Sequence, residues 1–212
     1  MPKHNVWIIK LGGSLVGSAD LTLWLAAIAQ ASHSCRMILV PGGGAFADVV
    51  RSAQNELKID DLVAHEMALL SMRQFGLALA ALCRPFVTAT LMCVPDIQAD
   101  NAASGLCIWD PCDPYLGGSS LPCDWRVTSD SLSLWLCGEL ENSRLLLVKS
   151  TTPEESNADL LNTAANKFVD DYFPILREQI RQPVWWLERT QADALLAVIN
   201  GRQQHTQYIG EL

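Results

Sequence analysis

The chain has 212 residues, of which 50% are hydrophobic and 18% are charged, so it can bury a sizeable core and is not expected to be disordered. Its formal net charge of -8 argues against nucleic acid or an anionic membrane as the main partner, although a small anionic ligand could bind where positive charge is concentrated. No apolar run has the length that spans a bilayer, and the N-terminus lacks the regions of a signal peptide. We therefore expect a soluble, cytoplasmic protein.

The chain contains seven cysteines, an odd number without any C-x-x-C pair. This arrangement does not suit a disulfide framework or a structural zinc site. Most of the cysteines lie in apolar stretches, so we expect buried thiols in a reducing compartment.

Strand and helix patterns alternate along the first half of the chain. Short apolar runs predict buried strands, and apolar residues at three- and four-residue spacing predict helices. The expected elements are a strand at 6–12, a helix at 21–31 with Asp20 as N-cap, a strand and glycine loop at 36–44, helices at 45–57 and 60–83, and a strand at 85–92.

The second half begins with a segment rich in Pro, Gly, Asp and Ser, residues 95–122, for which we expect short strands or a hairpin around "GLCIWDP". Regular patterns return after it. They predict a helix at 129–140 capped by Ser129 or Thr128, a strand at 143–150, a helix at 173–181, a strand at 183–188, a helix at 191–199 and a strand at 205–212.

The repeated β-α-β order, with strands that are apolar throughout, predicts an α/β fold with a mainly parallel sheet covered on both faces. We expect one domain, residues 1–212, arranged as a three-layer αβα sandwich. The pair Trp185–Trp186 should place one ring on each face of the sheet, because neighbouring strand residues point in opposite directions.

Two predicted strands run into glycine loops, "KLGGS" and "VPGGGAF". Ligands of open parallel sheets bind beyond the carboxyl ends of the strands, where glycine lets backbone N–H groups approach phosphate oxygens. A lone glycine pair is more often a tight turn, whereas three glycines opening a helix are harder to explain that way. Neither loop fits the P-loop or the dinucleotide-binding fingerprint.

Three charged residues lie at the ends of predicted elements and could meet near these loops. Lys10 and Lys149 each end a predicted buried strand, which suggests that they share one anionic ligand. Asp130 begins the helix at 129–140, either as a cap or as an acid that holds the lysines in place. The pair His65-Glu66 lacks the second histidine of a zinc protease and is expected to line a pocket or a surface.

The segments "IIKLGGSL", "ILVPGGGAFADVVR", "VTSDSLSLWL" and "RLLLVKS" resemble, in order and spacing, the amino acid kinase superfamily, and the resemblance covers nearly the whole chain. It implies the fold of that superfamily, with an acceptor-binding lobe at about 1–142 and a nucleotide-binding lobe at about 143–212. It also implies ATP-dependent phosphoryl transfer to a small molecule, in which positioning and charge stabilisation carry the reaction.

The resemblance also implies roles for individual residues. Lys10 would neutralise charge on the transferring phosphoryl group, and Asp130 would orient the lysines. The ATP phosphates would lie on Lys10, Gly12, Gly13 and Ser14, the acceptor on Gly42, Gly43, Gly44 and Thr128, and the rest of the nucleotide on Lys149, Ser150 and Thr151. Mg²⁺ would be carried by ATP and not by protein ligands. The resemblance further implies a homo-oligomer.

Two helical stretches, "AHEMALLSMRQFGLALA" and "NKFVDDYFPIL", resemble a smaller branch of this superfamily. Its members are the archaeal-type kinases of methanofuran synthesis, which convert (5-aminomethyl-3-furyl)methyl phosphate to its diphosphate, with relatives in methylotrophic bacteria. The resemblance to this branch implies the same acceptor and a place in one-carbon metabolism.

The sequence also departs from the superfamily pattern. Where many members continue after the strand with Asp-x-Asp-Gly, this chain reads "STTPEES", and the later "GGM…K" motif that supplies a second lysine is absent. Lys149, or less directly Lys167, would then supply the second positive charge. Two alternatives stay open: a non-catalytic nucleotide- or metabolite-binding paralogue, and a kinase for isopentenyl phosphate, UMP or an amino acid. A metal-storage role has no support beyond the fold.

Overall fold

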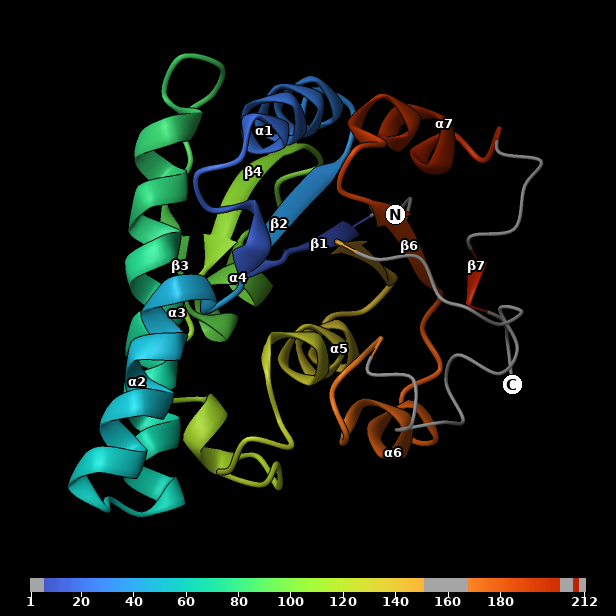
Figure 1. The fold of residues 1–212 in the computed structure, drawn as a ribbon. Coiled ribbons are helices and arrows are strands. Elements are labelled where there is room, and N and C mark those ends of the chain that lie inside the picture. Colours follow the sequence, from blue (N-terminus) through green and yellow to red (C-terminus); the bar gives the residue numbers. More distant parts are fainter. Residues whose placement is uncertain (1–5, 151–167, 203–207, 210–212) are drawn as a thin grey trace.

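The computed structural model describes residues 6–150, 168–202 and 208–209, and these form one sheet with helices on both faces (Figure 1). The sheet order is β3-β4-β2-β1-β5-β6-β7, and every pairing is parallel except the antiparallel pair β6–β7. The strands are β1 (Val6–Leu11), β2 (Arg36–Pro41), β3 (Leu91–Met92), β4 (Gly105–Trp109), β5 (Ser143–Lys149), β6 (Val184–Glu188) and β7 (Tyr208–Ile209). The predicted α/β class and three-layer arrangement are confirmed.

The helices follow the sheet in two layers (Figure 1). They are α1 (Ala19–Ala31), α2 (Gly44–Leu57), α3 (Asp61–Cys83), α4 (Val94–Ala99), α5 (Ser129–Glu139), α6 (Phe173–Arg177) and α7 (Leu195–Ile199), with short 3₁₀ turns η1 (Gly13–Leu15), η2 (Leu116–Gly118) and η4 (Ala192–Ala194). Helices α1 and α7 cover one face, α5 and α6 the other, and α2 and α3 lie together along one flank.

Alternation along the central strands divides the core into two apolar clusters. On β1, Trp7 and Ile9 face the α1 side, whereas Ile8 faces the α5 side. The expected split of the tryptophan pair on β6 is confirmed, since Trp186 belongs to the α5-side cluster and Trp185 packs on the α1 side. Both faces are covered, which explains why these strands are apolar at every position.

The strand predicted at 85–92 is wrong over most of its length, because only Leu91 and Met92 pair with β4. The chain first turns after α3, with the N–H groups of Phe86 and Val87 bonded to the carbonyl of Cys83 at 2.8 and 2.9 Å. β3 is the edge strand of the sheet. The apolar and β-branched residues before Leu91 have strand propensity, but they have no neighbouring strand to pair with.

Of the two expectations for residues 95–122, a short strand within "GLCIWDP" is confirmed by β4, and the hairpin is wrong. The segment contains the short helix α4, which has Pro95 in its first turn, and then β4, which runs parallel to its neighbours. Proline suits the first turn of a helix because its missing N–H has no partner there in any case.

The helix boundaries differ from the prediction mainly at the caps. Asp20 is not the N-cap of α1, because the Ser18 hydroxyl accepts from the Asp20 N–H at 3.1 Å and the helix begins one residue earlier than Asp20. The predicted helix at 173–181 ends at Arg177, and the one at 191–199 is a 3₁₀ turn followed by α7. Of the strand predicted at 205–212, residues 208–209 form β7, and the remainder lies outside the described residues.

All seven cysteines lie in the described part of the chain and are free thiols. Four of them are buried, as expected: Cys35, Cys83, Cys107 and Cys137. Among the helices described, α3 alone is long and apolar enough to cross a membrane by length and composition, with 33% of its most apolar window buried in the structure. Core helices of globular proteins pass the same test, and the buried face of α3, with Phe75 and Leu79, packs on the sheet.

Candidate active site

Two buried lysines meet one carboxylate at the carboxyl edge of the sheet. Lys10 lies near the end of β1 and Lys149 ends the adjacent strand β5, so both side chains emerge at the same edge. Asp130, in the first turn of α5, forms ion pairs with both, at 3.0 Å from its Oδ1 to the Lys10 Nζ and at 2.9 Å from its Oδ2 to the Lys149 Nζ. The structure therefore brings the three predicted residues together, and their shared role toward an anionic ligand stays a prediction.

Two basic groups and one acid make up this cluster, and a second acid, Asp170, acts on Lys149 as well. Burial on its own would raise the pKa of Asp130, but Lys10 and Lys149 overcome that effect and lower it to about 2. Burial lowers the pKa of the Lys149 ammonium, an effect that Asp130 opposes and Lys10 reinforces. The cluster therefore places two lysine side chains in a buried position at the edge of the sheet, where water screens their attraction for an anion only weakly.

A residue that the sequence reasoning missed, Asp170, holds the start of α5. Its carboxylate accepts from the N–H and the hydroxyl of Thr128, both at 2.8 Å, from the N–H and hydroxyl of Ser131, and from the N–H of Phe173 at 3.0 Å. Thr128 occupies the N-cap position of α5, yet its hydroxyl donates to Asp170 and does not cap the helix. The acidic pair before the Pro-containing turn of α6, "VDDYFP", was the available signal.

The two glycine loops pack directly against each other. A Cβ on Gly13 would lie 2.0 Å from the Gly44 Cα, and a Cβ on Gly42 would lie 2.6 Å from the Gly13 nitrogen. Gly44 also has a φ of +54°, in the left-handed region that favours glycine. A Cβ on Gly43 would lie 2.5 Å from the Cβ of Ala47. Loop packing and backbone conformation therefore account for these four glycines without any ligand.

Gly12 is different, because neither its backbone nor its surroundings require glycine. Its φ is -62°, and a Cβ would meet the Lys10 Nζ and the Val148 carbonyl at 3.5 Å, which is ordinary contact. A side chain here would stand beside the ammonium group of Lys10. Space next to that charge is what an incoming phosphate needs.

The other predicted residues divide between the site and its surroundings. Ser14 is exposed on η1 beside the glycine loops, and Ser150 is exposed just after β5. Thr128 is half-buried and lines the cavity described below. Thr151 and Lys167 lie outside the described residues. Among the residues that the structure does describe, no three His, Cys, Asp or Glu side chains form a group that could hold a metal ion.

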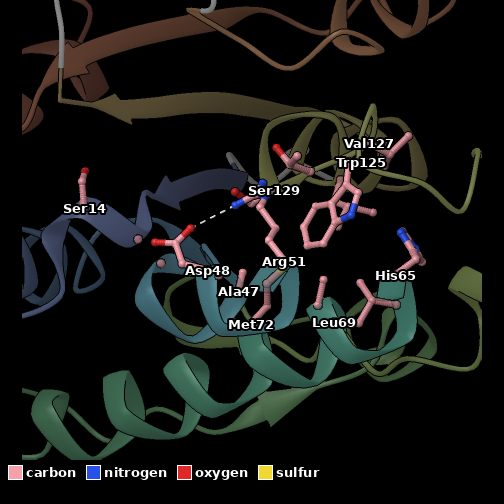
Figure 2. Close-up of a pocket in the computed structure, with 16 residues that line it drawn as sticks. Ser14, Ala47, Asp48, Arg51, His65, Leu69, Met72, Trp125, Val127 and Ser129 are labelled. Atoms are coloured by element: carbon pink, nitrogen blue, oxygen red, sulfur yellow. Dashed lines mark hydrogen bonds and ion pairs between the residues drawn. The ribbon is translucent and has the colours of Figure 1, made fainter. Parts of the chain in front are cut away.

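A cavity of about 220 Å³ opens beside the glycine loops (Figure 2). The loops form one side of it, α2 and α3 contribute Arg51 and His65, and the chain entering α5 contributes Trp125. Burial lowers the pKa of His65, so the imidazole is neutral at pH 7. The prediction that His65 and Glu66 line a pocket is confirmed, since both also line a larger neighbouring cavity of about 550 Å³.

Arg51 and Trp125 were not predicted as site residues. The Arg51 guanidinium lies 4.2 Å from the centre of the Trp125 ring, and its Nη1 is 3.1 Å from Asp48 (Figure 2). Arg51 and Trp125 are 74 positions apart in the sequence and belong to no common motif. They meet only because the loop before α5 folds against α2.

Comparison with known proteins agrees with this geometry. Residues 5–106 match the model of the amino acid kinase family. A [5-(aminomethyl)furan-3-yl]methyl phosphate kinase from Methanocaldococcus jannaschii is 25% identical to this chain over 214 residues, which cover 96% of this chain and 97% of the relative.

Solved structures with the same fold include two kinases of UMP. The UMP kinase of Ureaplasma parvum gives a TM-score of 0.70 at 15% identity, with 97% of this chain and 98% of that chain covered. The uridylate kinase of Archaeoglobus fulgidus gives 0.68 at 13% identity, covering 92% and 95%. Residues 5–106 thus resemble the amino acid kinase family, and the full-length relative and the solved structures that share the fold are kinases as well.

Proposed function

We propose that the protein is an ATP-dependent kinase that phosphorylates a small phosphorylated acceptor, (5-aminomethyl-3-furyl)methyl phosphate, to its diphosphate. The observation that carries this proposal is the Lys10–Asp130–Lys149 cluster, which holds two lysine side chains beside the glycine loops. The full-length relative, whose name gives a furanylmethyl phosphate as its substrate, supports the choice of acceptor and a role in methanofuran-type one-carbon cofactor synthesis.

In the proposed reaction, an oxygen of the acceptor phosphate bonds to the γ-phosphorus of ATP while the bond from that phosphorus to the β,γ-bridging oxygen breaks, and ADP leaves. Lys10 and Lys149 attract the charge that spreads over the transferring group, and Asp130 keeps both ammonium groups in place. Gly12 leaves room for a phosphate at Lys10. Mg²⁺ arrives with the nucleotide and neutralises part of its phosphate charge.

The proposal divides the chain into an acceptor-binding lobe at about 1–142 and a nucleotide-binding lobe at about 143–212. In the first lobe, Gly13 and Ser14 contact the ATP phosphates, and Gly42, Gly43, Gly44 and Thr128 surround the acceptor. In the second, Lys149, Ser150 and Thr151 face the nucleotide. The free thiols favour the reducing cytoplasm as the compartment in which the protein acts.

We also propose that the protein is a homo-oligomer in which α3 packs on α3 of a second copy. Val63, Leu70 and Leu77 recur every seven residues on α3, and all three are exposed. A seven-residue recurrence keeps apolar side chains on one stripe of a helix, the pattern with which two helices pack along their length.

A second function is supported by one specific feature, the segment after Lys149. It reads "STTPEES" where many family members carry Asp-x-Asp-Gly, so a paralogue that binds nucleotide or metabolite without turnover is the alternative. Kinases for UMP, isopentenyl phosphate or an amino acid differ from the main proposal in the acceptor alone.

The test is ADP formation from Mg-ATP with a panel of acceptors: the furan monophosphate, isopentenyl phosphate, UMP, glutamate and carbamate. We expect turnover with the furan monophosphate and a loss of at least about a hundredfold in kcat for Lys10→Met. Lys58→Gly is the matched control, since it removes a lysine at an exposed left-handed position that glycine accepts. No ADP with any acceptor, together with calorimetric binding of ATP, would instead establish the non-catalytic alternative.

A further inference from the structure

We propose that the cavity beside the glycine loops recognises a small planar ring that carries a phosphate, with the ring stacked on Trp125 and the phosphate held by Arg51. The inference rests on the proposed function and assigns the acceptor specificity of that reaction to these two side chains.

The indole of Trp125 is fixed from its edge. Its Nε1 donates to the Gln54 side-chain oxygen at 2.6 Å, and the Gln54 side-chain nitrogen donates to the Asp61 carboxylate at 2.8 Å. Because Gln54 uses both its acceptor and its donor, the amide has one satisfactory orientation and holds the ring in place. A pre-oriented aromatic plate in a cavity binds another planar ring without having to be ordered first.

The guanidinium of Arg51 lies over the face of that ring, at 4.2 Å from the ring centre. The Arg51 side chain is 47% exposed, and its ion-pair partner Asp48 is 73% exposed. Cation–π contacts and ion pairs in such exposed places are weak, so Arg51 can exchange them for an anion at small cost. Its planar fork matches a phosphate, and when it turns toward one, it leaves the indole face free for the acceptor ring.

The order of groups along the cavity gives the acceptor a direction. Ser14 lies toward one end with the glycine loops, Asp48 and Arg51 come next, and Trp125 and His65 lie toward the other end (Figure 2). A phosphate on Arg51 therefore lies on the side of the glycine loops, and the ring lies on the side of His65. This is the direction needed for an acceptor whose own phosphate receives the new phosphoryl group.

The size of the cavity favours a small acceptor. Its volume of about 220 Å³ is below the ~300–1,000 Å³ of sites that take drug-sized ligands. A single five-membered ring with a phosphate on a one-carbon link suits this space better than a nucleotide does. An aliphatic phosphate would use the Arg51 end and leave the indole unpaired.

The first experiment measures binding of (5-aminomethyl-3-furyl)methyl phosphate without ATP, by calorimetry and by tryptophan fluorescence. We expect Arg51→Met and Trp125→Leu each to weaken binding by about tenfold or more, and Trp125→Leu to abolish most of the fluorescence change. Trp125→Phe should retain binding within about threefold, because it keeps an aromatic face.

Arg73→Met is the matched control. Arg73 is 46% exposed and pairs with Asp110 at 3.4 Å, much as Arg51 pairs with Asp48, but it lies on α3 and does not line the cavity. The control should bind the furan monophosphate as the wild type does. A wild type that fails to bind this compound, or binding that is unchanged in Arg51→Met and Trp125→Leu, overturns the inference.

The second experiment separates this inference from the proposed reaction. In turnover assays Trp125→Leu should lower kcat/KM for the furan monophosphate by at least about tenfold more than for isopentenyl phosphate, which has no ring, whereas Arg51→Met should lower both. Equal losses in Trp125→Leu would mean that Trp125 only supports the fold, and the inference would fall. Absence of ADP with every acceptor, with furan binding that still depends on both residues, overturns the proposed reaction and leaves this inference standing.

Discussion

Gly12 and Gly13 are neighbours in the first glycine loop but differ in what a methyl group would meet. At Gly13 the added carbon would lie 2.0 Å from the Gly44 backbone, whereas at Gly12 it would meet nothing closer than 3.5 Å. Packing against the second loop therefore requires glycine at position 13. At position 12 packing does not require glycine, so only a ligand could.

The pair gives a direct prediction. Gly12→Ala should leave the free energy of unfolding within about 0.5 kcal/mol of the wild type but raise KM for ATP by about tenfold or more, because the methyl group stands beside the Lys10 ammonium. Gly13→Ala should cost about 2 kcal/mol or more, since the two loops would have to separate. Urea unfolding and ATP kinetics on both variants check these expectations. An unchanged KM for ATP in Gly12→Ala would contradict the placement of a phosphate beside Gly12.

The depressed pKa of Asp130 predicts how stability depends on pH. Its pKa is 3.8 in the absence of these interactions and about 2 in the folded chain, so the unfolded state binds the proton more readily. The resulting stabilisation is complete above about pH 4 and is lost as pH falls toward 2. A shift of this size corresponds to roughly 2 kcal/mol.

Asp130→Asn tests the sign of this effect. The difference in free energy of unfolding between the wild type and Asp130→Asn should shrink from pH 4.5 to about 2, because protonation removes from the wild type what the substitution has already removed. Measurements by urea unfolding across this range suffice. Two stability curves that run parallel would contradict the assigned charge state of Asp130.

At the scale of the element, α5 owes its position to a side chain from another part of the chain. Asp170 accepts hydrogen bonds from both Thr128 and Ser131, which replaces a local cap at the helix start that carries Asp130. Asp170→Asn replaces an accepting oxygen by an NH₂ group that faces those donors. We expect a loss of about 2–4 kcal/mol in the free energy of unfolding.

The adjacent acid provides the control for this substitution. Asp171 is exposed, so Asp171→Asn removes the same charge from the same turn and should change stability by less than about 0.5 kcal/mol. Equal stabilities for Asp170→Asn and Asp171→Asn would show that the hydrogen bonds of Asp170 contribute nothing to the start of α5.

The elements also show how far sequence reasoning reaches. The buried strands β1, β2, β5 and β6 were predictable from their sequences. A strand that is covered on both faces needs apolar residues at successive positions, and such a run is visible in the sequence. The lysine cluster followed from them, since Lys10 and Lys149 end adjacent strands. The edge strand β3 and the parallel direction of β4 depend on pairing partners, which no local pattern encodes.

The residues on the acceptor side of the site could not be predicted from the sequence, for a related reason. Lys10 and the glycine loops are marked by strand ends, but Arg51 and Trp125 lie on a helix surface and in a long irregular loop. Their meeting depends on how the loop before α5 folds over α2. The hydrogen bond from Trp125 to Gln54 that fixes this arrangement joins side chains 71 residues apart.

At the scale of the whole molecule, the outer face of α3 is the feature that the single chain leaves unexplained. Val63, Leu70 and Leu77 are 41%, 53% and 56% exposed, whereas the opposite face of the same helix packs on the sheet. Burying such a stripe against its own copy across a two-fold axis removes apolar surface from water on both chains at once.

We therefore expect the protein to elute as a homo-oligomer in size-exclusion chromatography with light scattering, and the double variant Leu70→Lys/Leu77→Lys to be a monomer at the same concentration. Charges placed on the stripe of both copies would face each other across the two-fold axis. Leu23→Lys is the control, because Leu23 is 60% exposed on α1, away from this stripe. A monomeric wild type, or an oligomer that survives the double substitution, would show that the stripe on α3 is not the contact between copies.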